Sequence, residues 1–226
     1  MHRSIASDAG VTHRRLAVVA TAALLAAAVA TPARAQGSAA EWADLITRYE
    51  AQVARAPGDA TARYTLAMLY ARNGRLLDGY RQLQEADQAV GHARRLEVVR
   101  QIVLDAEASI RQNPRDLLAR YRLAFARYFL NQPQAAAAEF ERVVAMEPRN
   151  DWGFGYLGQA YAAAGQDDRA VAAWQRGLQV NPGNSVLHYV LGLMYTKRND
   201  RRRAATHFAA AYRDRTLYDY VTGNRR

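Results

Sequence analysis

Apolar residues recur along the chain at intervals of three and four, and short polar segments interrupt them at regular distances. This period is typical of amphipathic α-helices that pack one face against a core. No long segment alternates with a period of two, so the pattern predicts no β-sheet. It predicts helices near residues 39–55, 60–72, 75–90, 93–112, 116–129, 133–146, 150–163, 167–180, 184–197 and 201–214.

The segments between these helices are short and rich in Asn, Pro, Gly and Asp. They read "APGD", "RNG", "QNPRD", "LNQP", "EPRN", "AAGQ" and "VNPGN". Such residues end one helix and begin the next. We therefore expect an all-α protein built from antiparallel helix pairs.

One pattern recurs at a fixed spacing. Leu157-Gly158 and Leu191-Gly192 lie 34 residues apart, and Leu123-Ala124 precedes them by the same interval. A fixed period of this size indicates a repeat array. The small residue after each Leu lets a second helix come close. The small residues expected at these helix contacts are Ala67, Ala124, Gly158 and Gly192, and on the facing helices Ala136, Ala170 and Ala204.

With these residues the chain resembles the tetratricopeptide-repeat (TPR) family, whose pattern is W-x2-L-G-x2-Y, a turn, A-x3-F and a closing Pro. The resemblance is close in 151–184, good in 117–150 and 185–218, and partial in 60–93. Arg127 stands where the family has Tyr, and Thr216 replaces the last closing Pro. The resemblance implies a right-handed superhelical solenoid and no particular activity.

The first half of the array is irregular. Segments 75–90 and 93–112 both resemble the second helix of a repeat. Either a first helix is missing between them, or the early repeats run in a different phase. We therefore divide the chain into degenerate repeats over 36–116, three in-phase repeats over 117–218 and a basic tail over 219–226.

The first 35 residues differ from the rest. Arginines precede an uncharged apolar run, "LAVVATAALLAAAVA", which is followed by a small-x-small site ending at Ala35. These are the parts of a secretory signal peptide. The run is shorter than the ~20 residues that span a bilayer. We expect cleavage before Gln36 and a periplasmic or secreted protein; an uncleaved inner-membrane anchor is the alternative.

The residues give little support for catalysis. The chain has no cysteine, and it lacks the metalloprotease, nucleophile-elbow and phosphate-loop motifs. His188 and His207 could approach each other across the last helix pair, but without a third ligand they predict no metal site. We expect no cofactor and no enzymatic activity.

The family lines a concave groove with fixed positions of each first helix. In this sequence those positions hold mostly apolar and aromatic residues with a few polar ones. A surface of this kind anchors binding partners. The alternative is that these side chains pack against neighbouring repeats. The candidate partner-binding residues are Tyr64, Met68, Tyr121, Phe125, Tyr128, Phe129, Trp152, Gln159, Tyr189, Leu193 and Lys197.

Some members of the family clamp an acidic peptide terminus with Lys and Asn at the fifth and ninth positions of the first helix. This clamp is absent here. The 117–150 repeat has Tyr121 and Phe125 there. We therefore expect a non-catalytic scaffold or assembly factor of the bacterial cell envelope that binds an apolar segment of another protein.

Positive charge suggests a second partner class. The chain carries a net charge of +10, much of it after residue 196, and Arg201, Arg202 and Arg203 open the last predicted helix. Such a cluster could bind an anionic envelope polymer or a membrane surface. Export argues against nucleic acid as the partner. Composition bias toward Arg would equally explain the cluster.

Overall fold

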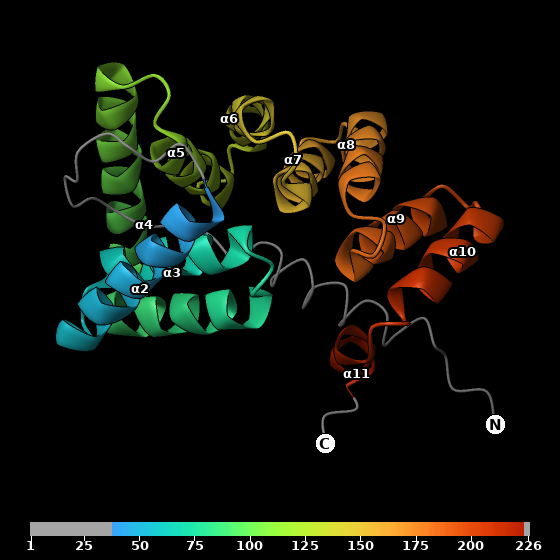
Figure 1. Ribbon diagram of the computed structural model, residues 1–226, viewed down its shortest axis with the longest axis horizontal. Helices are drawn as coiled ribbons and strands as arrows, with labels where there is room; N and C mark the ends of the chain where they lie inside the picture. Colours follow the sequence, from blue (N-terminus) through green and yellow to red (C-terminus); the bar gives the residue numbers. More distant parts are fainter. Residues whose placement is uncertain (1–37, 224–226) are drawn as a thin grey trace. The chain divides into compact units, whose positions relative to one another are not determined.

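The computed structural model describes residues 38–223, except for the side chains of residues 92 and 93, and every regular element in that range is an α-helix (Figure 1). The all-α prediction is therefore confirmed for these residues. The predicted signal peptide, residues 1–35, lies outside them, as do Gln36 and residues 224–226. The helices are Ala39–Arg55 (α2), Ala60–Arg72 (α3), Leu76–Gln112 (α4), Leu117–Phe129 (α5), Pro133–Met146 (α6), Asp151–Ala163 (α7), Asp167–Val180 (α8), Ser185–Lys197 (α9), Arg201–Ala211 (α10) and Arg215–Thr222 (α11).

The described residues form two compact units. One ends at Pro148 and contains α2 to α6; the other begins at Arg149 and contains α7 to α11. We call them the N-terminal unit and the C-terminal unit. The division predicted after residue 116 separates irregular from regular repeats, whereas the compact units divide 32 residues later, at 148.

Side-chain caps explain where many helices begin. The Asp59 carboxylate accepts a hydrogen bond from the Ala62 N–H, Asp116 does the same for Ala119, and the Asn184 side chain does so for Leu187. Each cap satisfies a backbone donor that has no partner within its helix. The helix starts predicted from the sequence agree within one residue, because Asp and Asn are recognisable as capping residues at these positions.

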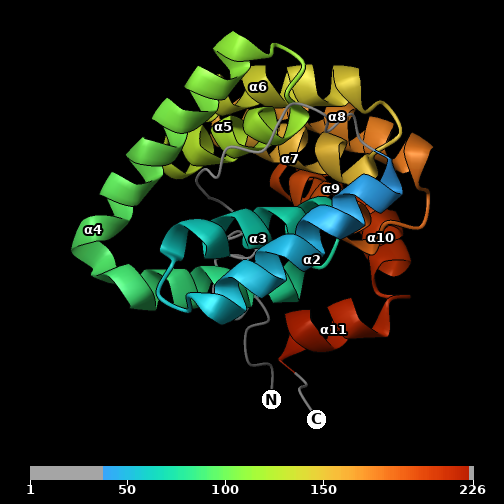
Figure 2. The ribbon, with the colours of Figure 1, turned by 60° about the vertical axis from the view of Figure 1, so that its left-hand side comes forward.

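The ambiguous segment 75–112 is one helix with a single break. Inside α4 only Gly91 has non-helical backbone angles, with φ 72° and ψ 162°, a region that is essentially restricted to glycine. The first half of α4 pairs with α3 and the second half packs against α5 (Figure 2). No first helix therefore lies between segments 75–90 and 93–112, so the alternative of a missing first helix is the correct one.

Two boundaries near the C-terminus differ from the prediction. The helix expected to run to residue 214 ends at Ala211, and residues 215–222 form α11 rather than a tail that begins at 219. The Asp214 carboxylate caps α11 by accepting hydrogen bonds from the N–H groups of Thr216 and Leu217. The buried side chain of Leu217 then packs α11 onto Tyr189 and Ala211.

The expected small residues lie at helix contacts. A Cβ atom on Gly158 would come within 2.7 Å of the Trp174 ring atom Cε2, and one on Gly192 would come within 2.7 Å of the Phe208 ring. Real Cβ atoms do not approach other atoms this closely. The glycines therefore allow α7 and α8, and α9 and α10, to pack as close pairs with a large aromatic residue between them.

Candidate functional site

The first two candidate residues, Tyr64 and Met68 of α3, have no exposed surface. The Tyr64 hydroxyl donates a hydrogen bond of 2.7 Å to the Asp87 carboxylate of α4. Burial and this hydrogen bond raise the pKa of Tyr64. Both side chains belong to the core of the N-terminal unit, so the expectation that they are exposed is wrong.

Tyr121 and Phe125 of α5 are also core residues, with exposed fractions of 0% and 1%. The Trp42 ring of α2 meets the Tyr121 ring edge-on, with centroids 5.9 Å apart. Tyr121 stacks on Phe125, which in turn meets Phe140 of α6 edge-on at 5.1 Å. A continuous aromatic row therefore runs from α2 through α5 to α6 inside the N-terminal unit.

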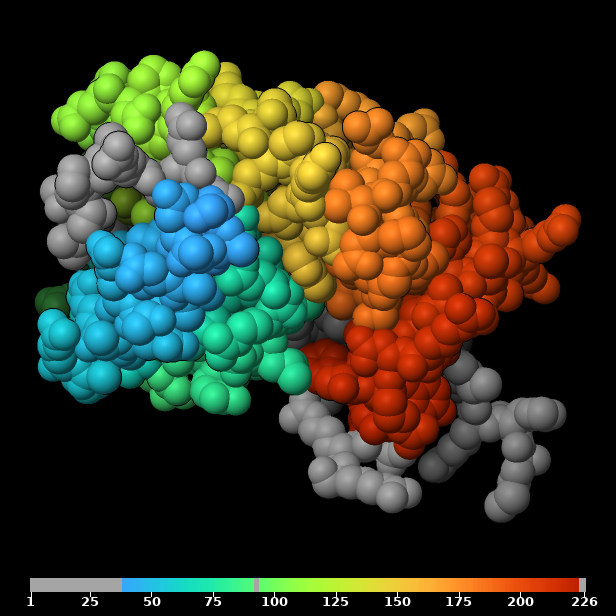
Figure 3. Space-filling model, in the orientation of Figure 1, coloured from blue at the N-terminus to red at the C-terminus, as the bar shows by residue number. Residues whose placement is uncertain are grey.

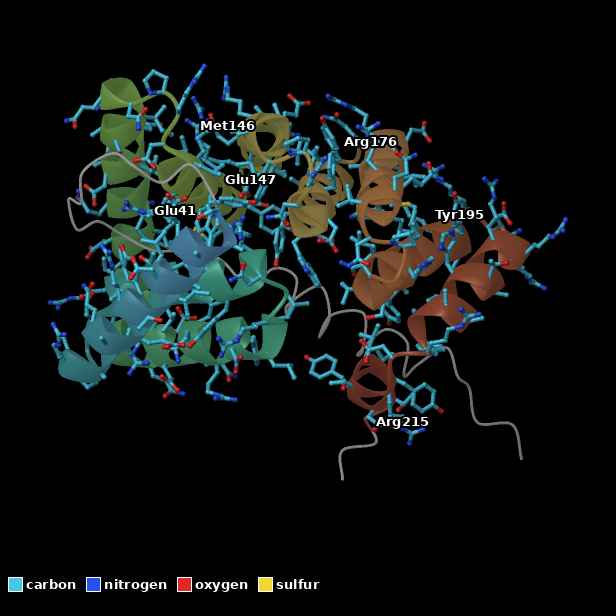
Figure 4. The ribbon with its side chains drawn as sticks, viewed as in Figure 1. Glu41, Met146, Glu147, Arg176, Tyr195 and Arg215 are labelled. Atoms are coloured by element: carbon cyan, nitrogen blue, oxygen red, sulfur yellow. The ribbon has the colours of Figure 1, made fainter. Side chains whose placement is uncertain are left out.

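Glu147, which directly follows α6, completes this core. Glu147 is labelled in Figure 4. Its carboxylate accepts hydrogen bonds from the Tyr121 hydroxyl at 2.7 Å and from Arg72 Nε at 3.2 Å. The Arg72 guanidinium lies 4.0 Å from the centre of the Trp42 ring. Both charged side chains are about nine-tenths buried, so each depends on the other for compensation.

The missing first helix accounts for this burial. Because only Gly91 separates the two halves of α4, α5 lies against α3, and Trp42 of α2 reaches Tyr121. In the space-filling view, α2 (blue) forms one face of its unit (Figure 3). The first-helix face, which the family resemblance placed on an open groove, is thus covered here.

Tyr128 and Phe129, at the end of α5, remain half-buried. The Arg95 guanidinium lies 4.9 Å from the centre of the Phe129 ring. Arg95 also pairs with Asp87, with 3.0 Å between Nη1 and Oδ2. Phe129 therefore already has an internal cationic neighbour.

The C-terminal unit differs. Trp152, Gln159 and Leu193 are half-buried and Lys197 is exposed, whereas Tyr189 is only 3% exposed. The burial of Tyr189 was missed because no helix was predicted after residue 214 and the tail was expected to begin at residue 219. The spacing of Leu217 and Val221 after the capping Asp214 is the signal that could have revealed this helix.

Most basic side chains near the end of α9 and the start of α10 have acidic partners. Lys197 Nζ lies 2.6 Å from the Asp167 carboxylate, and Arg198 lies 2.6 Å from that of Asp168. Arg203 pairs with Asp200, whose carboxylate also caps α10, and the backbone and side-chain hydrogen bonds from Arg203 hold the pKa of Asp200 below its usual value.

Arg201 and Arg202 are exposed, and neither forms a salt bridge with a described residue. Of the three predicted anion-binding arginines, these two therefore present the least compensated charge.

The approach of His188 and His207 is confirmed. Their Nδ1 atoms lie 3.0 Å apart. Within residues 38–223, no group of three or more His, Cys, Asp or Glu side chains is placed to hold a metal ion. No helix in that range is both long enough and apolar enough to span a membrane.

Comparison with known proteins agrees with this geometry. Residues 130–194 match a model of the tetratricopeptide-repeat family. These residues are therefore tetratricopeptide repeats. No curated protein matches its sequence. The close helix pairs formed around Gly158 and Gly192 are thus those of TPR repeats.

Solved structures share the fold. A MamA chain from Desulfovibrio magneticus RS-1 is 21% identical, with a TM-score of 0.55, and the match covers 82% of this chain and 99% of the other. Another MamA structure is 22% identical with a TM-score of 0.51, covering 75% and 91%. YrrB, described as a TPR protein with an unusual peptide-binding site, is 18% identical with a TM-score of 0.50, covering 77% and 97%.

Proposed function

We propose that this TPR protein is a non-catalytic scaffold that binds a segment of another protein through the first-helix face of its C-terminal unit. This face is defined by Trp152 and Gln159 of α7 and Leu193 and Lys197 of α9. The observation that carries the proposal is the partial exposure of this face, since the equivalent face of the N-terminal unit is covered. The proposal is supported by YrrB, which has the same fold and is described as having an unusual peptide-binding site.

The chemistry of this face favours an apolar partner segment. Trp152 and Leu193 offer partly exposed apolar surface, and aromatic anchors at the centre of an interface contribute most to affinity. Lys197 is already paired with Asp167. An acidic peptide terminus would have to compete with that carboxylate, so charge contributes little to the proposed recognition.

A binding experiment with matched variants tests the face. The tagged chain is used to isolate partners from cell-envelope extract, and the bound proteins are quantified by mass spectrometry. Trp152→Ala combined with Leu193→Ala should reduce a specific partner at least tenfold. Leu104→Ala removes a side chain that is 57% exposed on the N-terminal unit and should leave that partner unchanged. Equal capture by both variants would refute the proposed face.

A second candidate function is the binding of an anionic envelope polymer or membrane surface. The exposure of Arg201 and Arg202 without a described salt bridge favours it. Changing both to Gln should abolish such binding, and salt above physiological strength should weaken it because exposed charges are screened. Binding through Trp152 and Leu193 should instead survive the added salt.

The proposed site of action is the cell envelope, with the chain exported by its N-terminal segment. The sequence of residues 1–35 supports this proposal. Intact-mass measurement of protein recovered from its native cells tests it, because export with cleavage predicts a chain that begins at Gln36. Recovery of the full-length chain in the membrane fraction would favour an anchored scaffold instead.

A further inference from the structure

The last helix that the structure describes, α11, lies on the first-helix face of α9; both are labelled in Figure 1. Leu217 of α11 is buried against Tyr189 of α9, and Val221 packs against the same cluster. Val186 and Leu193 of α9 pack against it as well. Because Val186, Tyr189 and Leu193 are spaced by three and four residues, they share one face of α9. The surface that α11 covers therefore includes Leu193, a residue of the proposed partner-binding face.

α11 is held to this surface at few points. Of its eight residues, all within the described range, only Leu217 is buried. The Asp214 carboxylate caps the helix by accepting a hydrogen bond from the Leu217 N–H, and it accepts another, of 2.7 Å, from the Ser185 hydroxyl at the start of α9. Isolated helices shorter than ~12–15 residues are marginal in water, so α11 depends on docking for its helical form. A helix docked through one buried side chain can exchange with another helix of the same chemistry.

The residues of α11 describe the kind of segment that fits this surface. Leu217 and Val221 are four residues apart and therefore lie on one face of the helix. Arg215 is exposed and pairs with Asp219, with 3.1 Å between the guanidinium Nε and the carboxylate. The fitting segment is thus a short amphipathic helix with a capping Asp and two apolar residues four positions apart. An amphipathic helix that lays its apolar face against a hydrophobic groove is a common mode of peptide recognition.

The connection between α10 and α11 argues against exchange with a second copy of the chain. Only three residues, 212–214, join the two helices. Such a short connection keeps α11 at a high effective concentration beside its own α9. Exchange between two copies would require the same three residues to span from one chain to the other. A separate segment of a partner protein has no such constraint.

We propose that α11 is an internal ligand of the partner-binding face, and that the partner contributes a short amphipathic helix that takes the place of α11. This inference rests on the proposed function and deepens it, because it names the form and chemistry of the bound segment. Displacement of α11 uncovers Val186 and Tyr189 on the same face as Leu193, so the partner gains apolar surface that the closed chain hides. The apparent affinity of the closed chain is reduced by the fraction of molecules in which α11 stays docked.

Fluorescence anisotropy with a labelled peptide of residues 213–223 tests the exchange. Leu217→Asp in the full-length chain weakens the docking of its own α11, because it replaces the buried apolar side chain with a carboxylate. This variant should bind the peptide with a micromolar dissociation constant, at least tenfold more tightly than the unmodified chain does. A peptide that carries Leu217→Asp should bind neither chain. Leu104→Asp changes a side chain that is 57% exposed on the N-terminal unit, and this matched control should bind the peptide as the unmodified chain does.

A disulfide provides a second test that leaves the apolar contacts unchanged. The chain has no cysteine, and the side-chain oxygens of Ser185 and Asp214 lie 2.7 Å apart, so Ser185→Cys with Asp214→Cys introduces a single adjacent pair. Oxidation holds α11 on α9, whereas reduction leaves α11 without its cap and without its link to Ser185. The oxidised variant should therefore bind the peptide at least tenfold more weakly than the same variant after reduction.

Three outcomes would overturn the proposal. Equal peptide affinity of the Leu217→Asp and unmodified chains, or no binding to either, would leave α11 as a fixed cap of the last helix pair. A dimer of the unmodified chain that Leu217→Asp dissociates would assign the surface to a second copy. Neither test uses the partner or Trp152, so a failure here is distinguishable from a failure of the proposed partner binding.

Discussion

Gly158→Ala tests the helix contact on which the repeat depends. The change adds one methyl group to α7, directly against the Trp174 ring of α8. Trp174 is 3% exposed, and its indole N–H donates a hydrogen bond of 3.0 Å to the Gly155 carbonyl. The buried ring cannot move away from the added methyl group without disturbing that hydrogen bond.

The expected cost combines three contributions. Replacing glycine by alanine inside a helix stabilises it by about 1 kcal/mol. Overpacking a buried contact costs about 1–3 kcal/mol, and displacing the indole from its acceptor costs about 1–3 kcal/mol. The net result is a loss of about 1–5 kcal/mol in the free energy of unfolding, measured by urea denaturation followed by circular dichroism.

Gly155→Ala is the matched control, because it lies in the same helix and gains the same helix propensity. Its Cβ would meet only the end of the Leu187 side chain, at 3.0 Å, and that flexible end can shift. Its stability should therefore change by less than about 1 kcal/mol. In a Trp174→Leu background the cost of Gly158→Ala should fall by at least about 1 kcal/mol. An unchanged cost in that background would refute the contact.

Three further predictions concern other parts of the fold. Phe125→Ala should lower the free energy of unfolding by about 3–5 kcal/mol, because it removes a fully buried ring; a partner-binding defect in a chain of unchanged urea midpoint would contradict this. Gly91→Ala should cost about 1–3 kcal/mol in the same assay, because alanine disfavours φ 72° with ψ 162°; a stability gain would show that α4 can straighten. Burial, with a smaller contribution from Tyr212, raises the pKa of Tyr189 to about 12, above the usual 10. The stability that the neutral hydroxyl contributes below pH 10 is therefore lost as the pH rises from 10 to 12. In thermal melts over that pH range, Tyr189→Phe should lose less stability than the unmodified chain.

Local sequence signals predicted most of the helices correctly. Asp59, Asp116 and Asn184 cap helices within a residue of the predicted starts, because a cap depends only on residues close in sequence. Gly158 and Gly192 were likewise identified as helix contacts from the repeat alone. The end of α10 was wrong by three residues, since no glycine or proline marks it.

The exposure of the candidate residues could not be predicted in the same way. Position within a repeat specifies where a side chain points, whereas exposure depends on elements distant in sequence. Tyr121 is buried by Trp42 of α2 and bound to Glu147, and neither neighbour is implied by the repeat pattern. Tyr189 is covered by α11, a helix that departs from the repeat length.

Arg72 and Lys197 make this distinction concrete, because both occupy the thirteenth position of a first helix. Arg72 is nearly buried between Trp42 and the Glu147 carboxylate, whereas 63% of the Lys197 side chain is exposed beside Asp167. Removing Arg72 would leave a buried carboxylate without its cation, while removing Lys197 breaks an exposed pair that contributes little to stability. The N-terminal unit therefore uses its repeat positions to hold itself together, whereas in the C-terminal unit Tyr189 is buried but Trp152, Gln159, Leu193 and Lys197 keep exposed surface.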